Sequence, residues 1–264
     1  MLAFLDSGIG GLTVARSLQA LRPDADILYL ADRVNAPYGT KSEAALLSVL
    51  ERAIRALLAR GADCVVLACI TASCLYDRLS YDISPRVIPI LPFMAKEIAK
   101  QRGCVGMIAT EATVRSDAPI LALRRLGCVR PIERRAAQSL VSLAEAGRFS
   151  LGDRGVEQAL TDAVAPLLCR GVDTLVLGCT HFPYFEDAIR SLYGGLKILS
   201  PARIGSTALV NTLPPALLSG EGRFIYLTSM RGAARGKSIK TYKGEEVQCQ
   251  STDAEGSTMR WHRS

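Results

Sequence analysis

The sequence has few aromatic residues and no long apolar run. Only 6% of its 264 residues are Phe, Trp or Tyr, with a single Trp and two His. No apolar segment approaches the roughly 20 residues that a membrane-spanning helix needs. The start, MLAFLDSG, lacks the basic region and cleavage site of a signal peptide. We therefore expect no membrane segment and no signal peptide.

Familiar metal and nucleotide motifs are also missing. The eight cysteines form no CxxC pair and no Cys/His cluster with zinc spacing, so no metal site is predicted and reduced thiols are expected. The DSGIGG segment is not the GxGxxG dinucleotide motif. The net charge is +7, but the last 35 residues carry seven Lys/Arg against four Asp/Glu, and no basic run stands elsewhere. The positive charge is therefore better explained by solvated helix faces than by a nucleic-acid partner.

What is present is an alternation of strand and helix patterns. Apolar strand patterns lie at 2–5, 27–30, 64–68, 87–91, 104–109, 173–178, 196–199 and 223–227. Helix patterns lie at 11–21, 41–60, 111–126, 136–147, 153–169, 183–192 and 202–213. This order predicts an α/β fold with two parallel-sheet units. From about residue 229 the chain is polar without clear periodicity, which predicts a loose tail.

Two segments of the chain nearly repeat each other. Residues 57–69 (LLARGADCVVLAC) and 167–179 (LLCRGVDTLVLGC) are identical at eight of thirteen positions and lie 110 residues apart. Each copy has the pattern of a helix end, a Gly turn, a buried strand and a Cys. Because ligands bind at the carboxyl ends of parallel strands, Cys69 and Cys179 are predicted to face one substrate carbon from two sides. A following helix N-terminus is expected to lower each thiol pKa.

Two further motifs, and polar residues beside the two cysteines, follow strands at the same sheet edge. The DSGIGG segment at 6–11 is suited to hold a carboxylate at a helix N-terminus, with an ordinary tight turn as the alternative. APYG at 36–39 is by itself more typical of a turn. Thr71 and Thr180 offer hydroxyls beside the cysteines. His181 is placed to assist deprotonation of the neighbouring thiol or to donate to a substrate.

Together these motifs resemble those of glutamate racemases. DSGIGGLTV, APYG, ACxTAS and LGCTHFP occur in that order, and ATEATVRS at 109–116 fits as well. The paired cysteines are shared by the wider aspartate/glutamate racemase superfamily. The resemblance covers roughly residues 1–228. It implies two pseudo-symmetric parallel-sheet α/β domains, an active site in the cleft between them, and interconversion of L- and D-glutamate without a cofactor.

The resemblance also implies roles for individual residues. Cys69 and Cys179 would be the two acid/bases, one removing the α-proton as a thiolate while the other, as a thiol, reprotonates the opposite face. Asp6 and His181 would assist them respectively, and Glu145 is a further catalytic candidate. Substrate contacts are implied for Asp6, Ser7, Tyr38, Gly39, Ile70, Thr71, Thr180 and His181.

The resemblance extends to the domain arrangement and the biological role. It implies a first domain formed by 1–95 plus 206–228 and a second formed by 96–205. The polar tail at 229–264 does not resemble the helix that the family leads us to expect at the end of the first domain. It further implies a cytoplasmic homodimer that supplies D-glutamate for bacterial peptidoglycan.

Two motifs depart from the pattern of the glutamate racemases. Ile70 stands where the family motif ACNTAS has Asn, and the common GDT is here Ala31-Asp32-Arg33. An Ile side chain cannot hydrogen-bond a zwitterionic substrate, and losing such a bond costs roughly 1.5–3 kcal/mol, about 10- to 150-fold in binding. Two hypotheses therefore stay open. One is a working glutamate racemase, and the other is a racemase-fold homologue with weak or lost activity and a binding or regulatory role.

Overall fold

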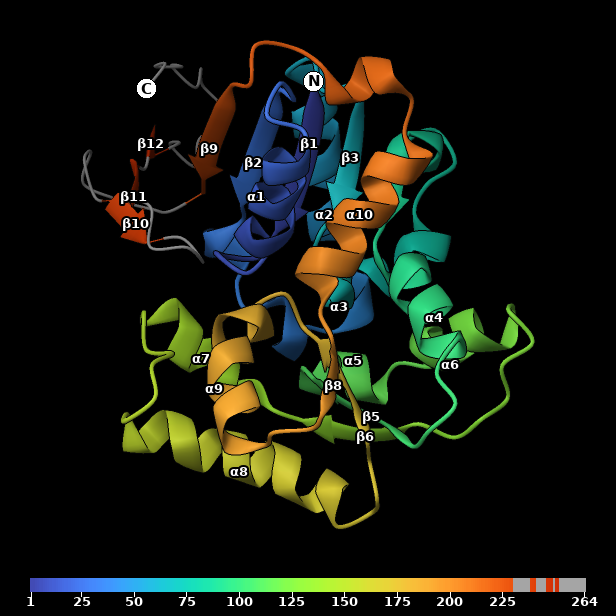
Figure 1. The fold of residues 1–264 in the computed structure, drawn as a ribbon. Helices are drawn as coiled ribbons and strands as arrows, with labels where there is room; N and C mark the ends of the chain where they lie inside the picture. The colour runs from blue at the N-terminus through green and yellow to red at the C-terminus, as the bar shows by residue number, and fades with distance from the viewer. Residues whose placement is uncertain (230–237, 241–245, 249, 252–264) are drawn as a thin grey trace.

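A computed structural model describes residues 1–229, 238–240, 246–248 and 250–251. It contains two parallel β-sheets, each in its own α/β domain (Figure 1). The first domain holds a six-stranded sheet in the order β12 (Gln250–Ser251), β9 (Phe224–Thr228), β2 (Ile27–Ala31), β1 (Leu2–Asp6), β3 (Cys64–Leu67) and β4 (Val87–Pro89). The second holds a four-stranded sheet in the order β6 (Glu133–Ala136), β5 (Val105–Ala109), β7 (Thr174–Gly178) and β8 (Lys197–Leu199). The predicted fold class is confirmed.

The central strands are buried along their whole length. Every residue of β1, β2, β3, β5 and β7 is buried, and each strand pairs in parallel with its neighbours. Parallel strands need cover on both faces, so continuous runs of Val, Leu and Ile are what they require. This explains why these strands were predictable as unbroken apolar segments.

Helices cover both sheets and were predicted less well than the strands. The helices are α1 (Leu12–Leu21), α2 (Glu43–Ala59), α3 (Ile70–Ser73), α4 (Leu91–Ala99), α5 (Glu111–Arg115), α6 (Ala118–Arg124), α7 (Gln138–Glu145), α8 (Arg154–Leu168), α9 (Glu186–Leu192) and α10 (Pro201–Thr212). The single helix expected at 111–126 is wrong, because extended Ser116 separates α5 from α6. Helix α4 was missed, as was β6, whose ERRA sequence has no apolar run.

The sequence repeat corresponds to repeated structure. In one copy the end of α2 leads through Gly61 into β3, and in the other the end of α8 leads through Gly171 into β7. Both glycines have left-handed φ angles, +85° and +77°, a conformation that favours glycine at the end of a helix. Both strands then deliver a cysteine at their carboxyl ends, as the repeat predicted.

The chain passes between the two domains and returns. In Figure 1 the strands β1 to β3 run toward the second domain, and α10 brings the chain back to lie along α1. The expected domain boundary at 205/206 falls inside α10, and the division stays a prediction.

Of the predicted tail at 229–264, most positions lie outside the described residues. β10 (Ser238–Lys240) and β11 (Glu246–Gln248) form an antiparallel pair.

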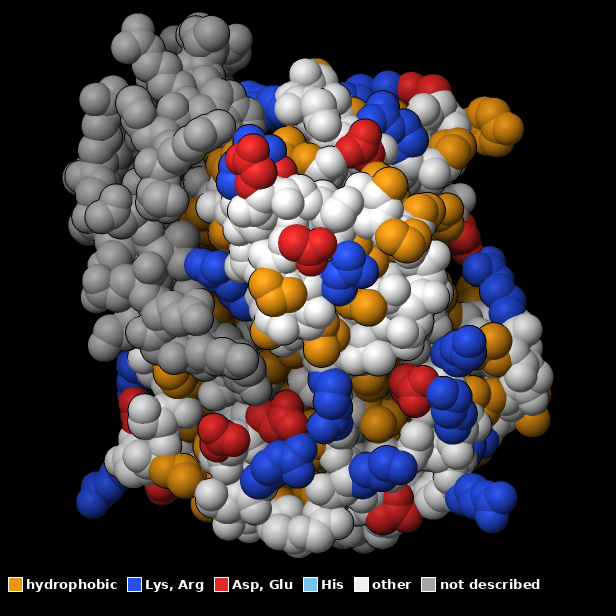
Figure 2. All heavy atoms as spheres, turned by 45° about the horizontal axis from the view of Figure 1, so that its top comes forward, with side chains coloured by type: hydrophobic (Ala, Val, Ile, Leu, Met, Phe, Trp, Pro, Cys, Tyr) orange, Lys and Arg blue, Asp and Glu red, His pale blue; other side chains and the backbone are white. Residues whose placement is uncertain are grey.

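The surface shows no sorting of charge on the face seen in Figure 2. Lys and Arg side chains are spread over it, with Asp and Glu between them. In the part of the chain that the structure describes, no helix combines the length and the apolarity needed to cross a membrane.

Candidate active site

The predicted site residues come from loops that meet at the seam between the domains. The first domain contributes the end of β1 and the loop after it, with Asp6 and Ser7. It also contributes the segments after β2, with Tyr38 and Gly39, and after β3, with Cys69 to Thr71. The second domain contributes the loop after β7, with Cys179 to His181, and the end of α7, with Glu145. Each of these loops leaves the carboxyl end of a strand or helix that points at the seam, as the fold class requires.

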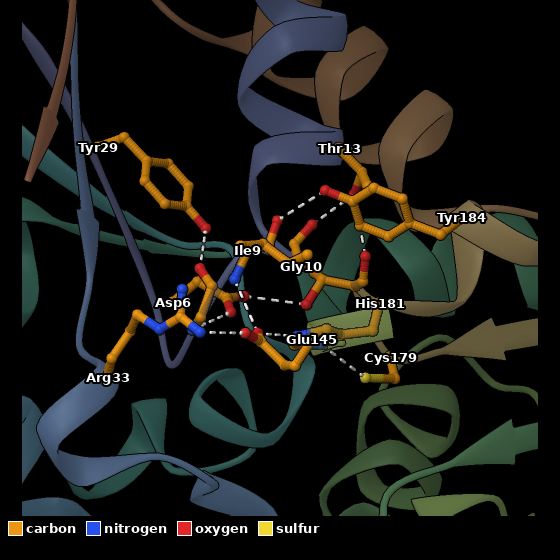
Figure 3. A network of polar contacts seen from close by, with 12 residues as sticks. Asp6, Ile9, Gly10, Thr13, Tyr29, Arg33, Glu145, Cys179, His181 and Tyr184 are labelled. Atoms are coloured by element: carbon orange, nitrogen blue, oxygen red, sulfur yellow. Dashed lines mark hydrogen bonds and ion pairs between the residues drawn. The ribbon is translucent and has the colours of Figure 1, made fainter. Parts of the chain in front are cut away.

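Cys179, His181 and Glu145 form a chain of hydrogen-bonded groups, which we call the Cys179 relay (Figure 3). Cys179 Sγ lies 3.6 Å from His181 Nδ1, and His181 Nε2 lies 2.7 Å from Glu145 Oε1. With Nε2–H donating to the carboxylate, Nδ1 either accepts the thiol proton or, once protonated, donates to the thiolate. The relay can therefore hold the proton on either side, as a general acid/base must.

The charged forms of His181 and Glu145 are favoured in the relay. Burial opposes a charge on His181, but its hydrogen bonds to Cys179 and Glu145 raise its pKa well above the ordinary value. Burial likewise opposes the Glu145 carboxylate, yet the hydrogen bond and charge of His181, the Ile9 N–H and the Arg33 charge lower its pKa. The directions agree with an imidazolium lying between a carboxylate and a sulfur atom.

Cys69 has a different environment. It precedes α3 and is only 6% exposed. Burial, the charge of Asp6 and the charge of Cys179 raise its pKa well above the ordinary thiol value. The expectation that a helix N-terminus would lower this pKa is therefore wrong, because α3 has only four residues and burial outweighs its dipole.

Asp6 links the two domains. Its Oδ1 accepts the Gly8 N–H at 3.0 Å, and its Oδ2 accepts the Thr180 hydroxyl at 2.9 Å. Burial raises its pKa, although His181 and these two hydrogen bonds act in the opposite direction. Ser7 follows it and is buried at the end of β1. The predicted assistant of Cys69 thus also holds the loop that carries Cys179.

The predicted substrate residues on the Cys69 side are buried in polar clusters. Thr71 Oγ1 lies 2.9 Å from Thr110 Oγ1 and 3.1 Å from Thr113 Oγ1, across the seam. The Tyr38 hydroxyl donates to Asp32 Oδ2 at 2.9 Å, and Gly39 lies beside Thr110. Burial and the charge of Asp32 raise the Tyr38 pKa well above its ordinary value, so this residue is a neutral hydrogen-bond donor.

Two glycines allow the first domain to approach the relay closely. A Cβ on Gly8 would lie 1.9 Å from Glu145 Oε1, and one on Gly10 would lie 2.5 Å from His181 Nδ1. Neither position tolerates a side chain without displacement of a relay member. The glycines predicted to let backbone approach a ligand also let the backbone of the first domain approach Glu145 and His181 of the second domain.

Ile70 is buried at the first position of α3, only 2% exposed. It belongs to the apolar cluster that crosses the seam and also includes Ile9 and Cys179. Its side chain has no polar atom to offer between Cys69 and Thr71. The departure noted in the sequence therefore lies within the site and not at its edge.

Several residues at the seam were given no role from sequence. Arg33 Nη2 lies 3.1 Å from Glu145 Oε2, and the Tyr184 hydroxyl donates to the Ile9 carbonyl at 3.2 Å. The Thr13 hydroxyl lies 3.1 Å from the Thr180 carbonyl. These contacts join positions up to 175 apart in the chain. The only sign of these contacts in the sequence was the replacement of the common GDT by Ala31-Asp32-Arg33, which introduces Arg33.

Two parallel-sheet α/β domains with a polar site at their seam define a structural class, and comparison with known proteins identifies the family. The model of the Asp/Glu/hydantoin racemase family matches residues 13–209, and the chain belongs to this family. The predicted enzyme class, a racemase, is confirmed by that membership. Among its relatives, a glutamate racemase from Desulforudis audaxviator is 39% identical over 197 residues, covering 74% of this chain and 71% of that protein.

Solved structures agree with the sequence comparison. Glutamate racemase isoform RacE1 from Bacillus anthracis matches with a TM-score of 0.81 and 26% identity, over 96% of this chain and 97% of that one. Glutamate racemase from Thermus thermophilus, in complex with β-chloro-D-alanine, matches with a TM-score of 0.79 and 27% identity over the same shares. The resemblance to glutamate racemases seen in the motifs is confirmed.

Proposed function

We propose that this protein interconverts L- and D-glutamate without a cofactor, using Cys69 and Cys179 as its two acid/bases. The observation that carries this proposal is the presence of two buried thiols, one from each domain, each just after the carboxyl end of one of two equivalent strands. Similarity to glutamate racemases supports glutamate as the substrate.

The reaction needs one proton removed and one returned. A thiolate on one side takes the α-proton of glutamate, and the electron pair stays on the α-carbon. The thiol on the other side then gives its proton to the opposite face of that carbon, which inverts it. The site is left with the thiol and thiolate exchanged. A buried seam between the domains keeps water away from such a carbanion-like transition state.

The test is loss of optical activity of L-glutamate, combined with exchange of the α-proton in D₂O. We expect both, with deuterium entering only the α-position. Retention of optical activity and of the α-proton at high enzyme concentration would refute the proposal.

We further propose that the product serves bacterial peptidoglycan synthesis, in the cytoplasm and as a homodimer. Similarity to glutamate racemases supports this role. The dimer is tested by the mass of the protein in solution, for which a monomer at all concentrations is the contrary result.

Ile70 favours a second candidate function. A homologue that binds glutamate but turns it over weakly or not at all would act as a binding or regulatory protein, and a buried Ile beside Cys69 fits such a loss. Calorimetric binding of glutamate without α-proton exchange would support this second function. Binding together with rapid exchange would exclude it.

A further inference from the structure

Arg33 joins the Cys179 relay from the other domain. It is the first residue of the short 3₁₀ helix Arg33–Asn35 after β2, and its Nη2 lies 3.1 Å from Glu145 Oε2 (Figure 3). We propose that Arg33 is a positioning residue that keeps the Glu145 carboxylate ionised and turned toward His181. The inference rests on the proposed function, because it gives the relay a part in catalysis.

The two oxygens of Glu145 are used differently. Oε1 accepts the Ile9 N–H at 2.9 Å and the His181 Nε2–H at 2.7 Å, whereas Oε2 faces Arg33. A carboxylate can rotate, so the Arg33 contact to Oε2 adds to the Ile9 N–H in holding Oε1 on the imidazole. Because Arg33 and Glu145 belong to different domains, this orientation exists only while the seam is closed.

The charges around the relay explain why a cation is needed. Glu145 and Asp6 are acidic groups, and Cys179 adds a negative charge whenever it is a thiolate. His181 supplies one positive charge. Tyr29 and Tyr184 also face Glu145, but their pKa values are raised by burial first and by neighbouring carboxylates second, so they stay neutral. Glutamate would bring two carboxylates and one ammonium. Arg33 offsets this excess of negative charge.

The position of Arg33 is fixed by its neighbours. Asp32 accepts hydrogen bonds from the Tyr38 hydroxyl at 2.9 Å, from Asn35 Nδ2 at 2.9 Å and from Ser229 Oγ at 2.7 Å. These bonds tie the loop after β2 to the end of β9. Arg33 therefore leaves a braced loop, and its side chain is only 27% exposed.

The sign of the expected effect follows from the charge. Removing a cation makes protonation of every nearby group easier, so the relay takes up a proton at higher pH. Loss of Arg33 should therefore move the acidic limb of the kcat/KM profile upward. Because Arg33 is partly exposed, about half to one pH unit is expected.

The experiment compares Arg33→Gln with Arg33→Lys across pH in both directions of racemisation. Arg33→Gln should shift the acidic limb upward and raise KM for glutamate, while Arg33→Lys, which keeps the charge, should retain the wild-type limb. Arg22→Gln is the matched control, since Arg22 pairs only loosely with Asp24, at 3.4 Å, away from the seam. An unmoved limb in Arg33→Gln, or an equal shift in Arg33→Lys, overturns the inference.

A second measurement does not depend on turnover. The tryptic peptide 171–190 contains Cys179 as its only cysteine, so its alkylation can be followed by mass spectrometry as a function of pH. The pH of half-maximal alkylation should rise in Arg33→Gln and not in Arg33→Lys. If wild type fails to racemise glutamate, the proposed function fails, and this measurement still decides the role of Arg33. An unchanged midpoint in Arg33→Gln contradicts it.

Discussion

Replacing Gly10 by Ala should disturb catalysis more than folding. The added Cβ would lie 2.5 Å from His181 Nδ1, 2.6 Å from Thr180 Oγ1 and 2.7 Å from His181 Cε1. Ordinary carbon contacts are about 3.5–4.0 Å, so the added Cβ and these atoms have to move apart by roughly 1 Å. Either the Cys179 loop moves away from Gly10 or the two domains separate slightly at the seam.

The size of the effect follows from the other contacts that Thr180 and His181 make in the site. Thr180 donates to Asp6 at 2.9 Å, and His181 lies 3.6 Å from Cys179 Sγ. A 1 Å displacement would break the first contact and lengthen the second. Overpacking of this kind costs about 1–3 kcal/mol, which corresponds to about 5- to 150-fold in rate if it falls on the closed site. We expect kcat/KM to fall by that factor in both directions.

The assay is the rate of racemisation from each enantiomer, with the thermal midpoint measured in parallel. Gly194→Ala is the control, because Gly194 is exposed in the same domain as His181 and its nearest contact to an added Cβ would be 4.0 Å. We expect the midpoint of Gly10→Ala to fall little, since opening the seam relieves the clash. Equal turnover in the two variants would refute the argument that the loop of 6–11 sets the relay geometry.

Three further predictions concern the thiols, the departure from the family motif and acid stability. Cys69→Ser and Cys179→Ser should each abolish racemisation yet eliminate from opposite enantiomers of a β-substituted analogue, and identical preferences would contradict opposed thiols. Ile70→Asn should raise kcat/KM about 10- to 150-fold while lowering the thermal midpoint, and unchanged turnover would remove Ile70 as the cause of weak activity. The hydrogen bond from Arg223 lowers the Asp26 pKa to about 2, so this carboxylate stabilises the fold at neutral pH and its contribution is lost as pH falls through about 2. Asp26→Asn should therefore lower the thermal midpoint at neutral pH and reduce its fall in acid, and an equal fall in both proteins would be the contrary result.

Features that depend on local pattern were predictable from sequence. The repeat around Cys69 and Cys179 predicted two equivalent strands, because a helix end, a glycine with positive φ and a buried apolar run recur in the same order. The central strands were predictable since burial on both faces demands continuous apolar residues. The polar edge strand at 133–136 was missed for the converse reason, because its register is set by pairing with β5 and not by its own sequence.

Features that depend on contacts between distant segments were not predictable from residues alone. Glu145 accepts a hydrogen bond from Ile9, 136 positions away, and faces Arg33 as well. The resemblance made Glu145 a candidate without saying what holds it. The Cys69 pKa was expected to be low from its place before a helix, but burial and the nearby Asp6 raise it. Desolvation depends on the packing of both domains, which no single segment encodes.

The two thiols are unequal before any substrate arrives. Cys179 lies 3.6 Å from His181 Nδ1, which can accept its proton, whereas burial and the charge of Asp6 raise the pKa of Cys69 and favour its neutral thiol. In the proposed reaction the closed site therefore starts with Cys179 as the base and Cys69 as the acid. Turnover reverses these states, leaving a thiolate on Cys69. That thiolate is buried beside Ile70, which cannot hydrogen-bond it, and Thr71 is bonded to Thr110 and Thr113. Because the two enantiomers have equal free energies, kcat/KM must be equal in the two directions, so the inequality of the thiols can appear only in the separate values of kcat and KM.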